Sequence, residues 1–263
     1  MVLFQLGQLS CIMRSGLINI FLFLSLVCSA QVTGRYPFSK ATADSEPDST
    51  VLADVLYYGE GNTDDDSGNE YDGTYSGGFN DSYSIQGDKS IFFNQYTWAI
   101  PEFDINEDTI AISFWYLHRS GYSTNGAARI AACGNTTNGW SLEVDQGNGD
   151  VEFHKYVSGT DYEARTSNSQ VSTDDTWYHV ILQTYGSGGG YADLYVNTSD
   201  VTADNITEAS GSFDNGAITM GENTGGTGTC VDNFAFFNGM VLTSDQRTYL
   251  YNHPETTLKE ANE

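Results

Sequence analysis

Residues 110–117 read Ile-Ala-Ile-Ser-Phe-Trp-Tyr-Leu, and this stretch sets the fold class. Side chains alternate between the two faces of a β-strand, so Ile110, Ile112, Phe114 and Tyr116 share one face. Branched and aromatic residues are enriched in strands because they pack well on a pleated surface. The stretch therefore predicts a strand with one large apolar face.

Similar short runs recur along the chain, separated by turn residues. They cover residues 55–58, 83–87, 89–93, 127–133, 140–144, 151–156, 176–184, 191–196, 217–221 and 230–237. The dipeptide Asn148-Gly149, between two of these runs, is a strong hairpin signal. Only residues 243–251 look helical, because Thr243 offers a capping side chain and Pro254 stops the pattern. Many short strands with one helical turn predict an all-β, two-sheet antiparallel β-sandwich.

The first thirty residues have the features of a secretory signal peptide. Residues 17–30 form a short apolar run after Arg14 and end in small residues, so cleavage is expected after Ala30. Translation from Met13 instead of Met1 would give a more compact signal, and an uncleaved anchor is the alternative to cleavage. We therefore expect a secreted, extracellular protein.

The rest of the chain suits a single domain. After a signal peptide at residues 1–30, a polar stretch with little periodicity forms a flexible lead at residues 31–54. The strand-like runs and the helical turn place one domain at residues 55–252, followed by a C-terminal tail at residues 253–263. All-β domains of 200–250 residues are common, so no second domain is expected.

The chain is strongly acidic. It holds 35 Asp and Glu against 10 Lys and Arg, and loss of Arg14 with the signal peptide would change the net charge from −25 to −26. Such an excess argues against nucleic acid and anionic membranes as partners, because their phosphates would be repelled. The 13% aromatic content favours a packed core over disorder.

Cysteine usage changes once the signal peptide is removed. Cys11 and Cys28 leave with it, and only Cys133 and Cys230 remain. A lone pair in a secreted protein is a candidate disulfide, and the sequence leaves open whether the two are bridged or free.

Four Asn-x-Ser/Thr motifs would be acceptors for N-linked glycans in a secreted eukaryotic or eukaryotic-virus protein, and would then lie on surface loops. The four asparagines are Asn80, Asn135, Asn197 and Asn205.

Several ordered motifs over residues 55–252 together resemble the laminin-G-like, concanavalin A-like jelly-roll family. They are D-S-G-N at residues 66–69, G-D-K-S-I-F-F at 87–93, T-I-A-I-S-F-W at 109–115, G-W-S-L at 139–142, D-T-W-Y-H-V at 175–180, D-L-Y-V-N at 193–197 and V-D-N-F-A-F-F at 231–237. Asn233, where the family usually has an acid, is a departure, as is Asn197-Thr198 in place of Asp-Gly. The resemblance implies two antiparallel sheets, calcium at the rim, and binding of glycans or surface partners instead of catalysis.

The acidic loop at residues 62–73 is the candidate calcium site. It holds five carboxylates, and oxygen ligands on a turn-rich backbone suit a hard cation, although such a loop is also an ordinary solvated turn. Strand alternation places Asp232 on the face of Phe234 and Phe236, where a carboxylate needs a partner. With the resemblance, the expected ligands are Asp66, Asn69 and Asp232, followed by Asp72 and Glu222. Asp65 is expected to face solvent.

Exposed aromatic rings beside polar groups are the expected docking points for a sugar. The candidates are Trp140, Tyr156 and Tyr162, with His154 nearby in sequence. The alternative is that these rings pack in the core, as aromatic side chains in a sandwich usually do.

Catalysis is not expected. Glu143 and Asp145 begin the E-x-D-x-E pattern of jelly-roll glycosidases, but Gly147 and Asn148 stand where the acid should follow. A retaining glycosidase needs two carboxyl groups close together. We therefore expect a non-catalytic, calcium-supported, lectin-like domain that binds glycans or glycoproteins. The alternatives are an adhesive module of a matrix, cell surface or virion that uses protein contacts, and a degenerate polysaccharide hydrolase.

Overall fold

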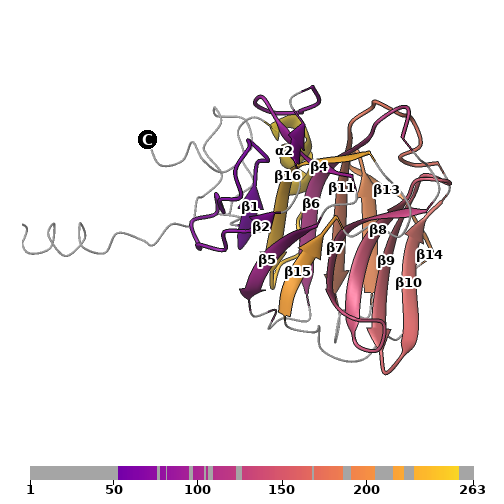
Figure 1. Ribbon diagram of the computed structural model, residues 1–263. Helices are drawn as coiled ribbons and strands as arrows, with labels where there is room; N and C mark the ends of the chain where they lie inside the picture. Colours follow the sequence, from indigo (N-terminus) through magenta and orange to yellow (C-terminus); the bar gives the residue numbers. More distant parts are fainter. Residues whose placement is uncertain are drawn as a thin grey trace, which may run out of the picture. The chain divides into compact units, whose positions relative to one another are not determined.

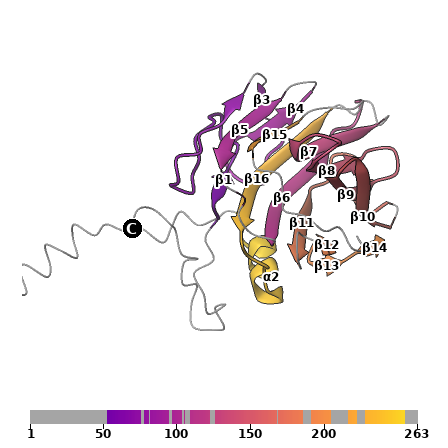
Figure 2. The same ribbon diagram turned by 90° about the horizontal axis from the view of Figure 1, so that it is seen from below.

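Two antiparallel β-sheets pack face to face in the computed structural model (Figures 1 and 2). The structure describes residues 53–75, 78–80, 82–94, 97–103, 105, 109–122, 126–167, 169–185, 191–204, 216–221 and 228–254. The predicted signal peptide, almost all of the predicted lead and most of the predicted tail lie outside these residues. None of the helices described is long and apolar enough to cross a membrane.

The first sheet is built around the stretch that predicted the fold class. Its central strand β6 is buried over all nine residues and pairs with β11 on one side and β16 on the other. The strand order is β13-β12-β11-β6-β16-β4-β3, with β1 also paired to β16. The strands are β1 (Val55–Tyr57), β3 (Gly78–Asn80), β4 (Ser90–Phe93), β6 (Ile110–His118), β11 (Tyr178–Tyr185), β12 (Tyr191–Val196), β13 (Ser199–Asp200) and β16 (Thr229–Asn238).

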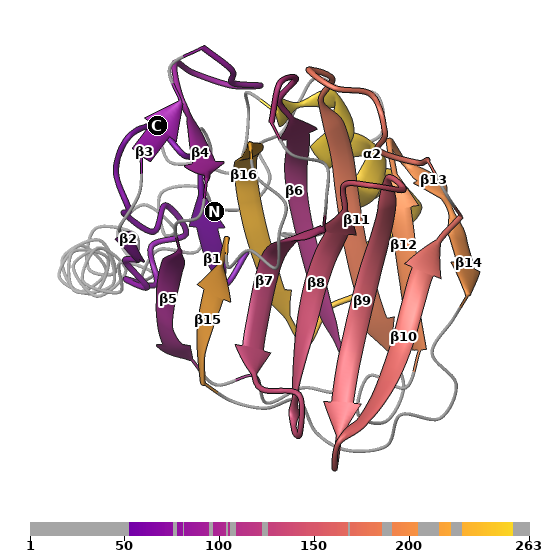
Figure 3. The same ribbon diagram turned by 45° about the vertical axis from the view of Figure 1, so that its right-hand side comes forward.

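The second sheet contains the predicted Asn148-Gly149 hairpin. The turn spans residues 146–149, joins β8 to β9 and places Asp145 opposite Asp150. The order is β14-β10-β9-β8-β7-β15-β5-β2, and Figure 3 shows β7 to β10 side by side. The strands are β2 (Thr74–Tyr75), β5 (Trp98–Phe103), β7 (Ala127–Gly134), β8 (Gly139–Asp145), β9 (Asp150–Val157), β10 (Thr160–Thr166), β14 (Thr202–Asp204) and β15 (Gly216–Met220).

The predicted helix covers the outer face of the first sheet. Helix α2 (Ser244–Asn252) begins at Thr243, whose side chain accepts from the Gln246 backbone N–H while the Gln246 side chain accepts from Thr243 N–H. These reciprocal bonds satisfy donors that a helix start leaves unpaired. Leu250 of α2 belongs to a second apolar cluster with Ile181 and Phe237, which point away from the main core.

The strand predictions need correction in two ways. Residues 83–87 are a loop that leads into β4, not a strand. Six strands of the described region were not predicted, and they are β2, β3, β5, β10, β13 and β14. In β10 the only apolar residues that pack inward are Tyr162 and Ala164, so its apolar alternation is too short to be recognised.

A β-bulge in β16 overturns the predicted orientation of Asp232. Pairing with β6 shifts register between Asp232 and Ala235, and Asn233 adopts a left-handed backbone conformation with φ of 49°. Val231 and Phe234 both belong to the main core. Asp232 follows Val231 directly, so it is turned away from the core instead of sharing the face of Phe234.

No disulfide joins the two cysteines of the described region. Cys133 of β7 is part of the main core between the sheets. Cys230 of β16 precedes the core residue Val231, so alternation turns it to the opposite face of its sheet. Facing different sides, the two buried thiols do not meet.

Candidate functional site

The outer face of β8, β9 and β10 carries a row of polar side chains, which we call the β8–β10 face. Alternating residues of β8 and β9 enter the main core, among them Trp140, Leu142 and Phe153. The residues between them therefore point outward. The face consists of Ser141, Glu143 and Asp145 of β8, Asp150, Glu152, His154 and Tyr156 of β9, and Asp161, Glu163 and Arg165 of β10, with Arg129 of β7 at its border.

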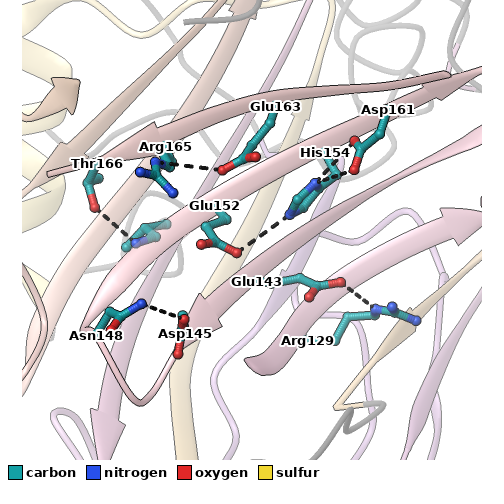
Figure 4. A network of polar contacts seen from close by, with 11 residues as sticks. Arg129, Glu143, Asp145, Asn148, Glu152, His154, Asp161, Glu163, Arg165 and Thr166 are labelled. Carbon is teal, nitrogen blue, oxygen red and sulfur yellow. Dashed lines mark hydrogen bonds and ion pairs between the residues drawn. The ribbon is translucent and has the colours of Figure 1, made fainter. Parts of the chain in front are cut away.

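Register across the hairpin decides which of these side chains meet. Glu143 lies directly opposite Glu152, and Ser141 lies opposite His154. On the other side of β9, His154 lies opposite Glu163. Side chains directly opposite on one face can interact across strands, and the face holds a network of neighbouring ion pairs and hydrogen bonds (Figure 4).

An ion pair anchors one border of the network. Arg129 Nε donates to Glu143 Oε1 over 2.9 Å. Only 21% of the Arg129 side chain and 10% of the Glu143 side chain are exposed. Limited solvent makes this pair stronger than an ordinary surface pair.

His154 lies at the centre of the network between two carboxylates. Its Nε2 is 3.5 Å from Glu152 Oε2, and its Nδ1 is 3.2 Å from Asp161 Oδ1. Burial alone would lower the pKa of His154, but the contacts with Glu152 and Asp161 outweigh it and raise the pKa to about 9. The imidazole is therefore charged at neutral pH. Its ring also stacks on Tyr156, with centroids 6.1 Å apart and planes 5° apart.

Two buried polar atoms of the face have no hydrogen-bond partner: Ser141 Oγ and Asp150 Oδ1. Ser141 is 2% exposed and Asp150 is 1% exposed. Burial and the neighbouring Glu152 raise the pKa of the Asp150 carboxyl. An unpaired buried polar atom costs about 1–3 kcal/mol, so both atoms favour a ligand that supplies a partner.

The four predicted sugar-binding residues divide into two groups. His154 and Tyr156 come together on the β8–β10 face. Trp140 does not join them, because it is 1% exposed and lies in the core near Phe153 and Phe236. Tyr162 is partly buried and also packs against the core. The expectation that Trp140 and Tyr162 are exposed platforms is therefore wrong.

The acidic loop is organised around Asp65. The prediction that Asp65 faces solvent is wrong, because its side chain is buried. Its carboxylate accepts hydrogen bonds from the backbone N–H groups of Leu56, Ser67 and Tyr71 and from the Ser67 hydroxyl. Asp65 thereby joins the loop to β1. Its role is to hold the turn together.

Predicted calcium ligands in this loop take part in hydrogen bonds. Asp65 N–H donates to Asp72 Oδ1 over 2.9 Å. The Asn69 side-chain amide donates to the Asp54 carbonyl over 3.0 Å. Asp66 is half-buried, and its backbone N–H donates to the Leu56 carbonyl.

Asp232 is fully buried and holds a different loop. Its carboxylate accepts from the backbone N–H groups of Ile85 at 2.9 Å, Gln86 at 3.4 Å and Asn233 at 2.9 Å. Burial raises the pKa of Asp232 to about 7 despite these bonds. Glu222 lies outside the described residues, and within them no three His, Cys, Asp or Glu side chains form a group that could hold a metal. Calcium binding by Asp66, Asn69, Asp232, Asp72 and Glu222 therefore stays a prediction.

The predicted glycosylation asparagines occupy different settings. Asn135 is exposed in the turn between β7 and β8. Asn197 is half-buried, and its Oδ1 accepts from His179 N–H over 3.0 Å. Asn205 and the Asn80 side chain lie outside the described part of the chain, and modification of all four stays a prediction.

Comparison with known proteins assigns the fold. Residues 93–246 match the family profile of the concanavalin A-like lectin/glucanases superfamily. The chain belongs to this superfamily. The match starts at the end of β4 and ends inside α2, so it includes every strand of the β8–β10 face. No curated protein matches the sequence at a significant level.

Solved structures with a similar fold include receptor-binding domains of botulinum neurotoxins. The serotype D binding domain matches with a TM-score of 0.58 and 15% identity, over 76% of this chain and 51% of that one. The type G receptor-binding domain matches with a TM-score of 0.56 and 16% identity, over 76% of this chain and 51% of that one. A third structure is the binding domain of botulinum neurotoxin DC in complex with rat synaptotagmin II. It matches with a TM-score of 0.57 and 15% identity, over 77% of this chain and 52% of that one. The chain thus spans about half the length of these proteins, and at such identity the likeness concerns the fold alone.

Sequence reasoning missed Arg129, Glu152 and Asp161, which complete the network. One signal was available. The Asn148-Gly149 dipeptide marks a hairpin between the two flanking strands. Counting outward from a two-residue turn would place Glu143 opposite His154, whereas the turn spans residues 146–149 and places Glu143 opposite Glu152. Asp161 could not be found this way, because β10 was not recognised as a strand.

Proposed function

We propose that the β8–β10 face binds glycans and that the domain does so without catalysis. The observation that carries this proposal is a network of planar, hydrogen-bonding side chains with two buried polar atoms left unpaired. A glycan offers many hydroxyls to such atoms and an apolar ring face to the His154–Tyr156 stack. Among the structural neighbours is a neurotoxin DC binding domain in complex with SialylT, which gives the fold a precedent for this class of ligand.

A glycan array tests the proposal. Wild-type domain should bind a defined group of glycans, and Tyr156→Ala should reduce that binding at least about tenfold because the ring contact is lost. Tyr191→Ala is the matched control. Tyr191 is also a tyrosine but lies on the first sheet and is 49% exposed. Equal loss in both variants, or no bound glycan at all, would contradict the proposal.

A hydrolase is the second candidate because Glu143 and Glu152 oppose each other across β8 and β9. Directly opposite residues have Cβ atoms about 4.5–5.5 Å apart, near the spacing of about 5–5.5 Å between the carboxyl groups of retaining glycosidases. Against it, a general acid must carry a proton, whereas Glu143 is paired with Arg129 and Glu152 with the charged His154. Release of reducing ends by the wild type, abolished in both Glu143→Gln and Glu152→Gln, would favour the hydrolase.

Calcium support and secretion are separate proposals that rest on the sequence. Asp66, Asn69 and Asp232 would supply oxygen ligands for calcium. A thermal melt with calcium and then with chelator measures this, since a ligand bound only to the native state raises the midpoint. An unchanged midpoint would remove calcium from the proposal and leave glycan binding in place. N-terminal sequencing of the secreted protein would test cleavage after Ala30.

A further inference from the structure

The charge on the β8–β10 face is strongly unbalanced. Three cationic groups stand against six carboxylates, which are Glu143, Asp145, Asp150, Glu152, Asp161 and Glu163. The cations are Arg129, Arg165 and the protonated His154. The face therefore carries more negative than positive charge, on a chain whose net charge is already −25.

The three cations contact carboxylates of the same face. Arg129 pairs with Glu143 at 2.9 Å, and His154 contacts Glu152 and Asp161. Arg165 Nε is 3.8 Å from Glu163 Oε1. An acidic ligand would have to compete with these internal carboxylates for every cation.

Asp145 and Asp150 form the acidic end of the face, opposite each other beside the hairpin turn. Asp145 accepts from Gly147 N–H and from the Asn148 side-chain amide, at 2.8 and 3.0 Å. Asp150 is buried and its Oδ1 has no hydrogen-bond partner. A buried carboxylate oxygen is best satisfied by a donor, and a cationic donor gives the stronger bond.

The second unpaired atom lies farther along the strands. Ser141 lies directly opposite His154 and is four residues along β8 from Asp145, which lies opposite Asp150. The unpaired atom of this residue is its Oγ. At about 3.3 Å per residue the two rows are roughly 13 Å apart. A single sugar does not cover that length, so one ligand reaching both atoms must contain several sugar units.

We infer that the β8–β10 face selects a linear oligosaccharide that carries free amino groups, and rejects acidic glycans. This inference rests on the proposed function and adds the ligand class. The amino groups would lie toward the Asp145–Asp150 end, with a ring over Tyr156. Acidic glycans are repelled by the surplus carboxylates and by the net charge of the protein.

Three oligosaccharides of equal length test the inference by calorimetry at about pH 6, where ordinary amines are protonated and carboxylates ionised. They are a glucosamine oligomer, its N-acetylated form and a uronic acid oligomer. At low salt the amino form should bind about tenfold tighter than the N-acetylated form, and the uronic acid form should not bind measurably. In about 1 M salt the difference should shrink, because charges are screened within about 3 Å.

A variant series locates the effect on this face. Asp145→Asn, at the end of the face where the amino groups would lie, should reduce the preference for the amino form at least about threefold, while binding of the N-acetylated form changes little. Asp200→Asn, the same charge change on β13 of the first sheet, should leave the preference unchanged.

The possible outcomes are distinct. Equal binding of the amino and N-acetylated forms at low salt, or measurable binding of the uronic acid form, would overturn the inference and leave the proposed function standing. An equal effect of Asp145→Asn and Asp200→Asn would overturn the assignment to this face. Failure to bind all three oligomers and every glycan on the array would overturn both proposals.

Discussion

The outer faces of the two sheets place a histidine in opposite environments. On the first sheet, His179 lies beside Trp115 and Tyr251 of α2, with ring centroids 5.0 and 6.0 Å away, and burial lowers its pKa to about 3. On the second sheet, His154 contacts Glu152 and Asp161, and its pKa rises to about 9. Within the described residues, a helix covers the first face and carboxylates line the second. The covered face is built for stability, whereas the other keeps charge and hydrogen-bonding capacity at the surface.

Phe237→Ala breaks the covered face and should have the largest effect. Phe237 is fully buried in the cluster beneath α2. Truncation of a buried phenylalanine lowers the free energy of unfolding by about 3–5 kcal/mol. Urea denaturation measures the change through the midpoint.

Tyr156→Ala on the β8–β10 face is the matched comparison, because Tyr156 is only half-buried. The Tyr156→Ala substitution should lower the free energy of unfolding by about 1 kcal/mol, the central value for point mutations. Similar losses in the two variants would show that the faces do not differ in their contribution to stability.

Acid should act on the covered face through His179. A histidine whose folded pKa is lowered is neutral in the native state but protonated when unfolded, so stability present at neutral pH is lost as pH falls from 6.5 toward 3. The expected loss attributable to His179 is about 1–2 kcal/mol between pH 6.5 and pH 5.

The His179→Gln variant isolates this contribution. A glutamine amide reaches the position of Nε2, which lies 2.9 Å from Ser113 Oγ, and it does not titrate. Its unfolding free energy should therefore depend less on pH than that of the wild type. Parallel pH profiles for the two proteins would mean that His179 is protonated without cost. Fluorescence of the adjacent Trp115 offers a second probe of the same transition.

Local patterns predicted most of the fold because they need no information from distant residues. The alternation of β6, the Asn148-Gly149 turn and the Thr243 cap each act within a few residues, and the structure confirms all three. Strand β10 was not predicted, because its outward positions are charged and few of its inward positions are apolar.

Non-local geometry explains the errors in the site. The left-handed Asn233 inserts a bulge that reverses the face of Asp232, and alternation alone cannot reveal it. Asp65 and Asp66 are adjacent carboxylates in one loop, and only folding brings the donors of Leu56 and Tyr71 to Asp65. The residues around His154 come from three strands, so register had to be known before they could be grouped.

Alkali should act on the β8–β10 face, and this is the smallest expected effect. A histidine with a raised folded pKa stabilises the native state fully below its unfolded value of about 6.5, and the contribution is lost as pH rises through about 9. Asp161 is 47% exposed, so solvent and salt screen its share of the contact and reduce the loss. NMR titration of the imidazole gives the direct measurement. In the His154→Gln variant, the free energy of unfolding should depend less on pH between pH 6.5 and 9. If His154 titrates near pH 6.5 in the native wild type, Glu152 and Asp161 do not stabilise its charged form. The contrast with His179 would then be lost.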